Sequence, residues 1–212
     1  MPVTRGTTVT PWSTSSAPGS VSFSHTVDAN TTLLILAIGS EADLTASSPY
    51  WNTSEAFTLI GSVTTSSSGG DVRVWLFGLV NPTSGTHNIT FSTSGAGDNA
   101  WAVAANYLGT ETSSVAAATN LIDSEDNGNN AAATVAMSGS TTSGACLVIA
   151  GTFRGGDGNP ATESNAGGFA DVSTDETGTS TFSDTCWYYG DDVDGGTGGT
   201  VSPPSRASSP NA

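Results

Sequence analysis

Lysine is absent from this chain of 212 residues, and its only strongly basic side chains are four arginines. Against 19 acidic residues they leave a formal net charge of −15. Nucleic acids and anionic membrane surfaces are bound mainly through cationic side chains, so we expect neither as a partner. The lack of lysine also excludes a P-loop and an amine nucleophile.

Cysteine, histidine and long apolar runs are scarce as well. The two histidines and two cysteines lie far apart in the sequence, at positions 25, 87, 146 and 186, and lack the paired spacing of a zinc site, so we expect none. Cys146 and Cys186 are either two buried thiols or one disulfide bridge, and the sequence leaves both open. The longest apolar run, residues 33–38, is too short to span a bilayer. The opening residues lack the apolar segment of a signal peptide, so we expect synthesis in a cytoplasm without one.

Short strand patterns separated by turn residues fill most of the chain. Residues 21–27 alternate apolar and polar side chains, whereas residues 31–40 are apolar on both faces, as in a buried central strand. Residues 72–80 and 87–93 flank a turn with Pro82 and Gly85, which predicts a hairpin. Further strands are expected at residues 56–63, 99–109, 115–122, 131–138, 144–153, 168–172, 180–189 and 198–201.

These patterns predict an all-β protein, an antiparallel β-sandwich of jelly-roll-like form built from residues 20–200 as a single domain. Residues 1–19 contain three prolines and no evident strand pattern, so we expect an extended N-terminal arm there. Residues 201–212 are rich in serine and proline and are expected to form an extended C-terminal tail. Both segments would suit docking onto neighbouring proteins, for example by strand addition.

Reactive side chains do not form a recognisable set. His25 lies on an apolar strand face, which is typical of a packed or hydrogen-bonded histidine, and no Gly-X-Ser-X-Gly motif is present. A glycosidase would need two facing carboxylates, and sequence cannot measure their separation. We therefore expect no catalytic residues and no enzyme activity.

One acidic segment is a candidate cation site. Asp123, Glu125 and Asn127 match the first three oxygen ligands of a calcium loop, and Gly128 stands at its sixth position. Thr134 occupies the twelfth position, where such a loop has glutamate. These three residues are candidate calcium ligands, a solvated turn is the alternative, and no other cofactor is expected.

Three aromatic side chains are candidates for contact with a partner. Trp12 is the only large apolar side chain of the expected arm, and Tyr50 and Trp51 fall in a polar segment expected to be a loop. Together with Trp187 the loop aromatics could also stack on sugars. Packing in the core is the alternative for all of them.

A series of short motifs follows the expected strands of the first half of the chain: His25-Thr26-Val27, Leu33 to Leu36, Leu59-Ile60-Gly61, Val74-Trp75-Leu76, Asn81-Pro82, Ser84-Gly85-Thr86 and Ile89-Thr90-Phe91. In this order they resemble a β-sandwich module of tailed-phage virion proteins and bacterial surface proteins. The resemblance covers roughly residues 20–110. These motifs are structural, and the module has no shared catalytic residues to transfer.

The resemblance implies a structural virion protein of a tailed phage. Within that class we expect a capsid decoration (cement) protein on the outer capsid surface, made in the host cytoplasm, because an acidic surface suits outward display and not contact with packaged DNA. Its expected partners are the major capsid protein, other virion proteins and further copies of the chain. The alternative is a carbohydrate-binding or adhesin module of a phage tail, a fibre or a bacterial surface protein.

Overall fold

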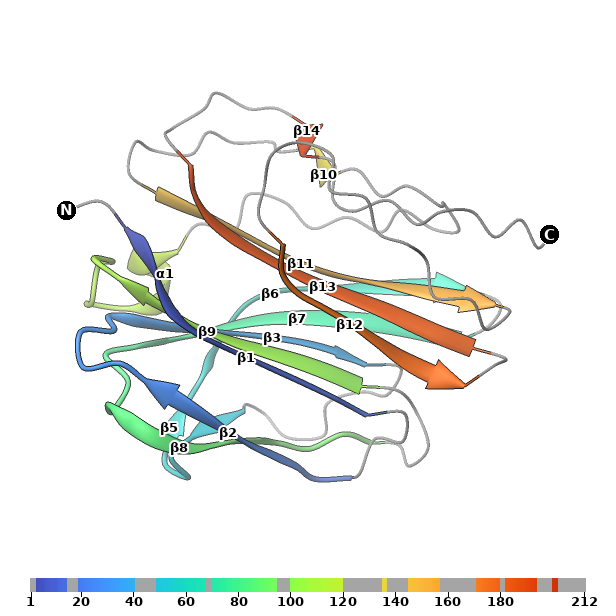
Figure 1. Ribbon diagram of the computed structural model, residues 1–212, viewed down its shortest axis with the longest axis horizontal. Coiled ribbons are helices and arrows are strands. Elements are labelled where there is room, and N and C mark those ends of the chain that lie inside the picture. Colours follow the sequence, from blue (N-terminus) through green and yellow to red (C-terminus); the bar gives the residue numbers. More distant parts are fainter. Residues whose placement is uncertain are drawn as a thin grey trace.

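The computed structural model describes residues 3–14, 19–40, 49–67, 70–94, 100–119, 135–136, 145–156, 171–179, 182–193 and 200–201. Strands account for most of these residues, and α1 (Val115–Ala118) is the one helix among them. All paired strands in these ranges run antiparallel. The prediction of an all-β antiparallel sandwich is confirmed (Figure 1). No helix in the described part could cross a membrane.

A five-stranded sheet forms the middle of the molecule, in the order β1-β9-β3-β7-β6. All eight residues of its central strand, β3, are buried. Because side chains alternate between the two faces of a strand, both faces must be covered, as the apolar run predicted. The strands of this sheet are β1 (Thr4–Thr14), β9 (Ala100–Leu108), β3 (Leu33–Ser40), β7 (Gly70–Val80) and β6 (Thr58–Ser67).

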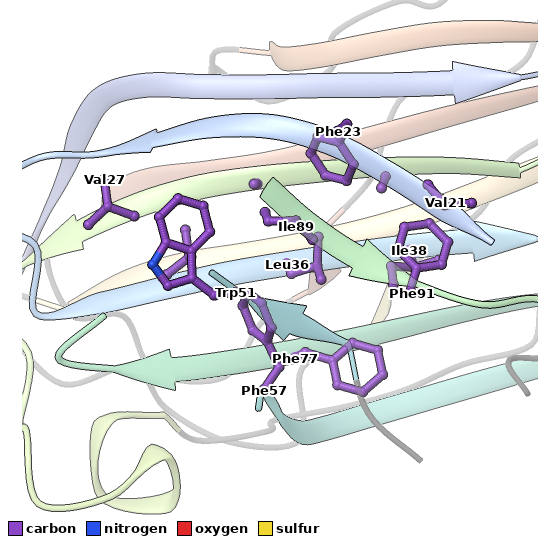
Figure 2. Close-up of a cluster of buried hydrophobic side chains, with 13 residues drawn as sticks. Val21, Phe23, Val27, Leu36, Ile38, Trp51, Phe57, Phe77, Ile89 and Phe91 are labelled. Atoms are coloured by element: carbon purple, nitrogen blue, oxygen red, sulfur yellow. The ribbon is translucent and has the colours of Figure 1, made fainter. Parts of the chain in front are cut away.

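A four-stranded sheet covers one face of the central sheet, in the order β2-β8-β4-β5. Buried and exposed residues alternate along all of β2, as its sequence predicted. Its strands are β2 (Val21–Val27), β8 (Gly85–Phe91), β4 (Tyr50–Trp51) and β5 (Glu55–Ala56). Figure 2 shows the apolar side chains buried between the two sheets, whose removal from water is the main stabilising contribution. They include Phe23, Leu36, Trp51, Phe77, Ile89 and Phe91.

A three-stranded sheet lies against the opposite face, in the order β11-β13-β12 (Figure 1). Its strands are β11 (Ala145–Gly156), β13 (Phe182–Val193) and β12 (Asp171–Thr179), and they contact β1, β3, β7 and β9. The side chains of the central sheet on this face are buried too, among them Leu33, Ile35, Trp101 and Tyr107. A separate short pair joins β10 (Val135–Ala136) to β14 (Thr200–Val201).

The predicted hairpin between β7 and β8 is wrong. β7 pairs with β3 and β6 in the central sheet, whereas β8 pairs with β2 and β4 in the four-stranded sheet. The Asn81–Gly85 turn therefore carries the chain from one layer to the other, with positive φ values of 49° at Asn81 and 115° at Gly85. A hairpin and an interlayer crossing both need two alternating strands around a turn, so the local pattern does not distinguish them.

The expected N-terminal arm also needs correction. Residues 4–14 form β1, an edge strand of the central sheet paired with β9. Proline lacks the N–H that a central strand donates, but it is tolerated at a sheet edge, which explains Pro11 in this strand. Threonine is abundant in β1 and favours strands because it is β-branched. The prolines therefore made an edge strand of the sandwich look like an irregular arm in the sequence.

A strand was predicted at residues 115–122, but residues 115–118 form α1. The Ser114 side chain caps this single turn by accepting a hydrogen bond of 3.1 Å from the Ala117 N–H. Three consecutive alanines follow Val115, and alanine has the highest helix propensity. Capping and propensity thus prevail over the weak apolar pattern.

The backbone register separates the two cysteines. Cys146 lies opposite Asp192, and Cys186 lies opposite Thr152, six positions further along β11. At about 3.3 Å per residue the two positions are roughly 20 Å apart along the strand. This pairing rules out a bridge between them, because bonded cysteines have Cα atoms within about 7 Å. Most of the expected C-terminal tail, residues 202–212, lies outside the described residues.

Candidate functional site

The candidate calcium ligands Asp123, Glu125 and Asn127 lie outside the described residues, so this assignment stays a prediction. Within the described part, no group of three or more histidine, cysteine, aspartate or glutamate side chains is placed to hold a metal.

For Trp51 the alternative of packing in the core is confirmed, and its assignment as a partner contact is wrong. Its side chain is 0% exposed and lies in the core between the two sheets (Figure 2). The indole N–H donates a 2.9 Å hydrogen bond to the carbonyl oxygen of Thr83, so the polar atom is satisfied inside. Tyr50 precedes it on the same strand, points to the opposite face and is 37% exposed. Of this predicted pair, Tyr50 alone is available to a partner.

Trp12 is partly buried against the same core. Its ring stacks on Phe23 with 6.1 Å between the centroids and meets Phe91 edge-on at 5.9 Å. The side chain thus fixes β1 onto the four-stranded sheet. Its predicted contact with a partner is confined to the part of the ring that stays exposed.

The main polar cluster of the described part surrounds His25, which is 1% exposed. Its Nδ1 lies 2.8 Å from Thr10 Oγ1 on β1, and its Nε2 lies 3.1 Å from Asn106 Oδ1 on β9. His25 belongs to β2, so the two contacts join the four-stranded sheet to the central sheet.

The neighbours of Asn106 define the proton positions on His25. The Asn106 amide nitrogen donates to the carbonyl oxygen of Thr26 at 2.9 Å and to Asp28 Oδ2 at 3.2 Å. Both of these groups are acceptors, so Asn106 Oδ1 faces His25 and accepts from an Nε2–H. The network therefore places a proton on Nε2. When the ring is neutral, Nδ1 is unprotonated and accepts the Thr10 hydroxyl proton.

Asp28 extends the cluster toward the surface. Its Oδ1 accepts a 3.4 Å hydrogen bond from the Thr8 hydroxyl on β1. Gly6 lies beside it, where an added Cβ would come within 3.0 Å of Asn106 Cβ and 3.3 Å of Asp28 Oδ2. Strand β1 therefore packs closely over the His25 cluster, which we define as Thr8, Thr10, His25, Asp28 and Asn106.

Burial lowers the pKa of His25 below its ordinary value of 6.5, because the charged imidazolium is poorly solvated inside the sandwich. The hydrogen bond to Asn106 and the negative charge of Asp28 act in the opposite direction but do not reverse the effect. His25 is therefore neutral at pH 7, in agreement with the hydrogen-bond directions.

Both histidines contact Trp51. The imidazole of His25 meets the indole edge-to-face with 5.9 Å between centroids, and His87 does so at 5.3 Å. His25 and His87 are also directly opposite each other in the β2–β8 ladder. The three rings link β2, β4 and β8 at this position.

The Thr10 hydroxyl, the His25 imidazole and the Asn106 amide oxygen follow one another in the order found in catalytic triads. In such a triad a nucleophile is activated by a base, and a third group orients the base. Here, however, Thr10 lies on the same face of β1 as Trp12, whose ring packs into the core, and its hydroxyl meets an imidazole that is almost fully buried. The arrangement as it stands stabilises the contact between layers and holds one neutral, titratable group inside.

The outer edge of β6 is a second feature of functional interest. β6 is the last strand of the central sheet, and its sequence TLIGSVTTSS contains no charged residue and no proline. Leu59 in this strand is 51% exposed. Most natural edge strands are protected by lysine, proline or covering segments. In the described part of the chain, the feature of β6 that would disfavour pairing with another strand is a register irregularity between Leu59 and Gly61.

The cluster around His25 was only partly visible in the sequence. The prediction of a packed, hydrogen-bonded His25 is confirmed, but Thr10 and Asn106 were missed. One signal for Asn106 was present: it shares a strand face with Ala102 and Ala104, and a lone amide on a buried face needs a polar partner.

Comparison of the chain with protein-family models, with curated proteins and with solved structures gives no match.

Proposed function

We propose that this chain is a structural virion protein of a tailed phage, most simply a capsid decoration protein that sits on the outer capsid surface. It would bind the major capsid protein and further copies of itself through its surface and strand edges, without catalytic turnover. The proposal rests on the resemblance of residues 20–110 and on the physical properties of one sheet edge.

The single observation that carries the proposal is the outer edge of β6, which pairs with no further strand among the residues that the structure describes. Unpaired N–H and C=O groups of an uncharged edge strand favour pairing with a strand of another protein. In a chain of net charge −15, a strand of ten residues without charge also presents no acidic side chain of its own to another acidic surface. Decoration proteins need such a surface, because they attach to an assembled lattice.

The experiment has two stages. Mass spectrometry of purified particles first establishes whether the chain is a stoichiometric component of the virion. Particles are then assembled with Thr64→Lys, which places a charge on the exposed part of β6, and with Thr7→Lys, the same change at an exposed position of β1. We expect Thr64→Lys to reduce occupancy on the particle and Thr7→Lys to leave it near the wild-type level.

Absence of the chain from particles would overturn the proposal as a whole. Equal occupancy of both variants would remove β6 as the docking edge and leave the virion assignment standing. Equal loss in both variants would point to a general effect of the added charge.

The carbohydrate-binding alternative has less support from the geometry. A stacking platform of Tyr50 with Trp51 cannot form, because one ring is buried and the two side chains point to opposite faces of β4. Calcium-dependent binding on a glycan array, abolished by EDTA, would favour that alternative over the decoration protein.

A further inference from the structure

The buried imidazole of His25 lies where an edge strand meets the sandwich. β1 has one neighbour in its sheet, β9, and its Thr10 hydroxyl bonds directly to His25 Nδ1. The β1–β9 ladder is interrupted by a register shift between Arg5 and Val9. β1 is thus held by an irregular ladder to β9, by side-chain contacts with β2 and β8, among them the His25 bond, and by contacts with the three-stranded sheet.

We propose that His25 makes the docking of β1 dependent on pH, so that protonation of this imidazole in mild acid loosens β1 while the rest of the sandwich stays folded. This proposal does not depend on the virion assignment.

The physical basis is the cost of a buried charge. In the docked state the imidazolium would lie in a nearly dry environment, and an ion without adequate solvation is unfavourable there. Protonation would also force the Thr10 hydroxyl to turn from donor to acceptor at Nδ1. When β1 separates, water reaches the ring from the side that Thr10 and Gly6 had closed. Acid therefore favours the separated state over the docked one.

The charged groups around His25 set the size of the effect. Asp28, in the turn after β2, attracts the protonated ring and opposes the loosening, with Asn106 between them. His87 lies opposite His25 on β8, and its ring contacts the other edge of the same cluster through Trp51. The residues of β1 and β9 that contact the ring, Thr10 and Asn106, are uncharged, and so is Trp51 on β4.

Hydrogen exchange of the full-length protein, read by mass spectrometry and corrected for intrinsic rates, measures this opening by segment. We compare residues 3–14 with residues 33–40 in β3 at about pH 7.5 and about pH 5.5, on either side of the ordinary histidine pKa. The expected result is a loss of protection in residues 3–14 at the lower pH, with β3 unchanged.

Two variants separate titration from packing. His25→Gln keeps a nitrogen donor for Asn106 but cannot be protonated, so its β1 protection should not change between the two pH values. Asp28→Asn removes the charge that favours the imidazolium, so the acid-induced loss should be larger than in the wild type. His87→Gln is the matched control and should respond like the wild type.

Four results would overturn the proposal. Three of them are a wild-type β1 that keeps its protection in acid, an acid response that survives in His25→Gln, and a response abolished by His87→Gln alone. The fourth is an equal loss in β1 and β3, because that pattern means global unfolding.

Discussion

Gly39 and Trp101 face each other across the β3–β9 ladder, and the indole occupies the space above the glycine. A Cβ added to Gly39 would overlap the Trp101 indole, including its Nε1. Both residues lie inside the sandwich, where the ring cannot swing into solvent. At this position the absence of a side chain on one strand makes room for the largest side chain on the next.

We therefore expect Gly39→Ala to lower the free energy of unfolding by about 1–3 kcal/mol, the usual cost of overpacking a core. Urea denaturation followed by tryptophan fluorescence measures the change. Gly19→Ala is the control, since nothing lies within 4 Å of a Cβ there, and it should be near neutral. A Gly39→Ala variant as stable as Gly19→Ala would mean that the Trp101 ring can move aside.

The global stability should also depend on the titration of His25. Burial lowers the pKa of His25 in the folded state, so the unfolded chain takes up the proton at higher pH than the folded chain does. The contribution of His25 is complete above about pH 6.5, the ordinary histidine value. It decreases as the pH falls toward the lowered folded-state pKa and then becomes constant.

Urea titrations at several pH values test this linkage. The expected difference between wild type and His25→Gln is a free energy of unfolding that falls more steeply for the wild type below about pH 6.5. Parallel curves for the two proteins over this range would show that the imidazole is already solvated in the folded state.

At the scale of the element, β1 is the segment for which the structure differs most from the sequence-based expectation. As an arm outside the sandwich, it would be removable without loss of stability. As an edge strand it covers β9, carries Thr10 and Gly6 over the His25 cluster and seats Trp12 against Phe23 and Phe91. Removing it would expose apolar area of the core to water.

Truncation of the Trp12 side chain tests this role with a smaller change than deletion. We expect Trp12→Ala to lower the free energy of unfolding by about 3 kcal/mol. This value is near the lower end of the range for tryptophan-to-alanine substitutions in protein cores, because the ring is only partly buried. Differential scanning calorimetry of this variant and of Thr7→Ala, an exposed position on the same strand, gives the comparison. Similar melting temperatures for the two variants would show that β1 contributes little to the sandwich.

At the scale of the whole molecule, the charge imbalance dominates. A chain with 19 acidic residues and only four arginines repels itself in the compact state. We expect the melting temperature to rise when sodium chloride increases from about 10 mM to about 0.3 M, because added ions screen this repulsion. Thermal unfolding followed by circular dichroism measures the shift.

The same measurement tests the candidate calcium ligands Asp123, Glu125 and Asn127. Calcium chloride at equal ionic strength supplies the same general screening, so an additional rise would report specific binding to the folded state. Asp123→Asn should remove that excess if these residues hold the ion. A melting temperature that falls with sodium chloride would contradict the screening argument itself.

The sequence by itself determined the class of the protein and the positions of most strands in its first half. Side chains in a strand alternate between its two faces. The alternation in residues 21–27 therefore predicts a strand with one buried face, and the run of β3, which is apolar on both faces, predicts a strand buried on both. His25 on an apolar face was likewise readable as a packed histidine. These inferences use only neighbours along the chain.

Only the tertiary structure decided which strands pair and which side chains meet. Strands β7 and β8 look like a hairpin locally, yet they belong to different sheets, because each finds its partners among strands distant in sequence. For the same reason Trp51 is buried, β1 is a strand, and Thr10 meets His25 and Asn106. Backbone pairing and the hydrogen bonds between layers are set by contacts across the fold, and local sequence patterns do not encode the identity of the partner.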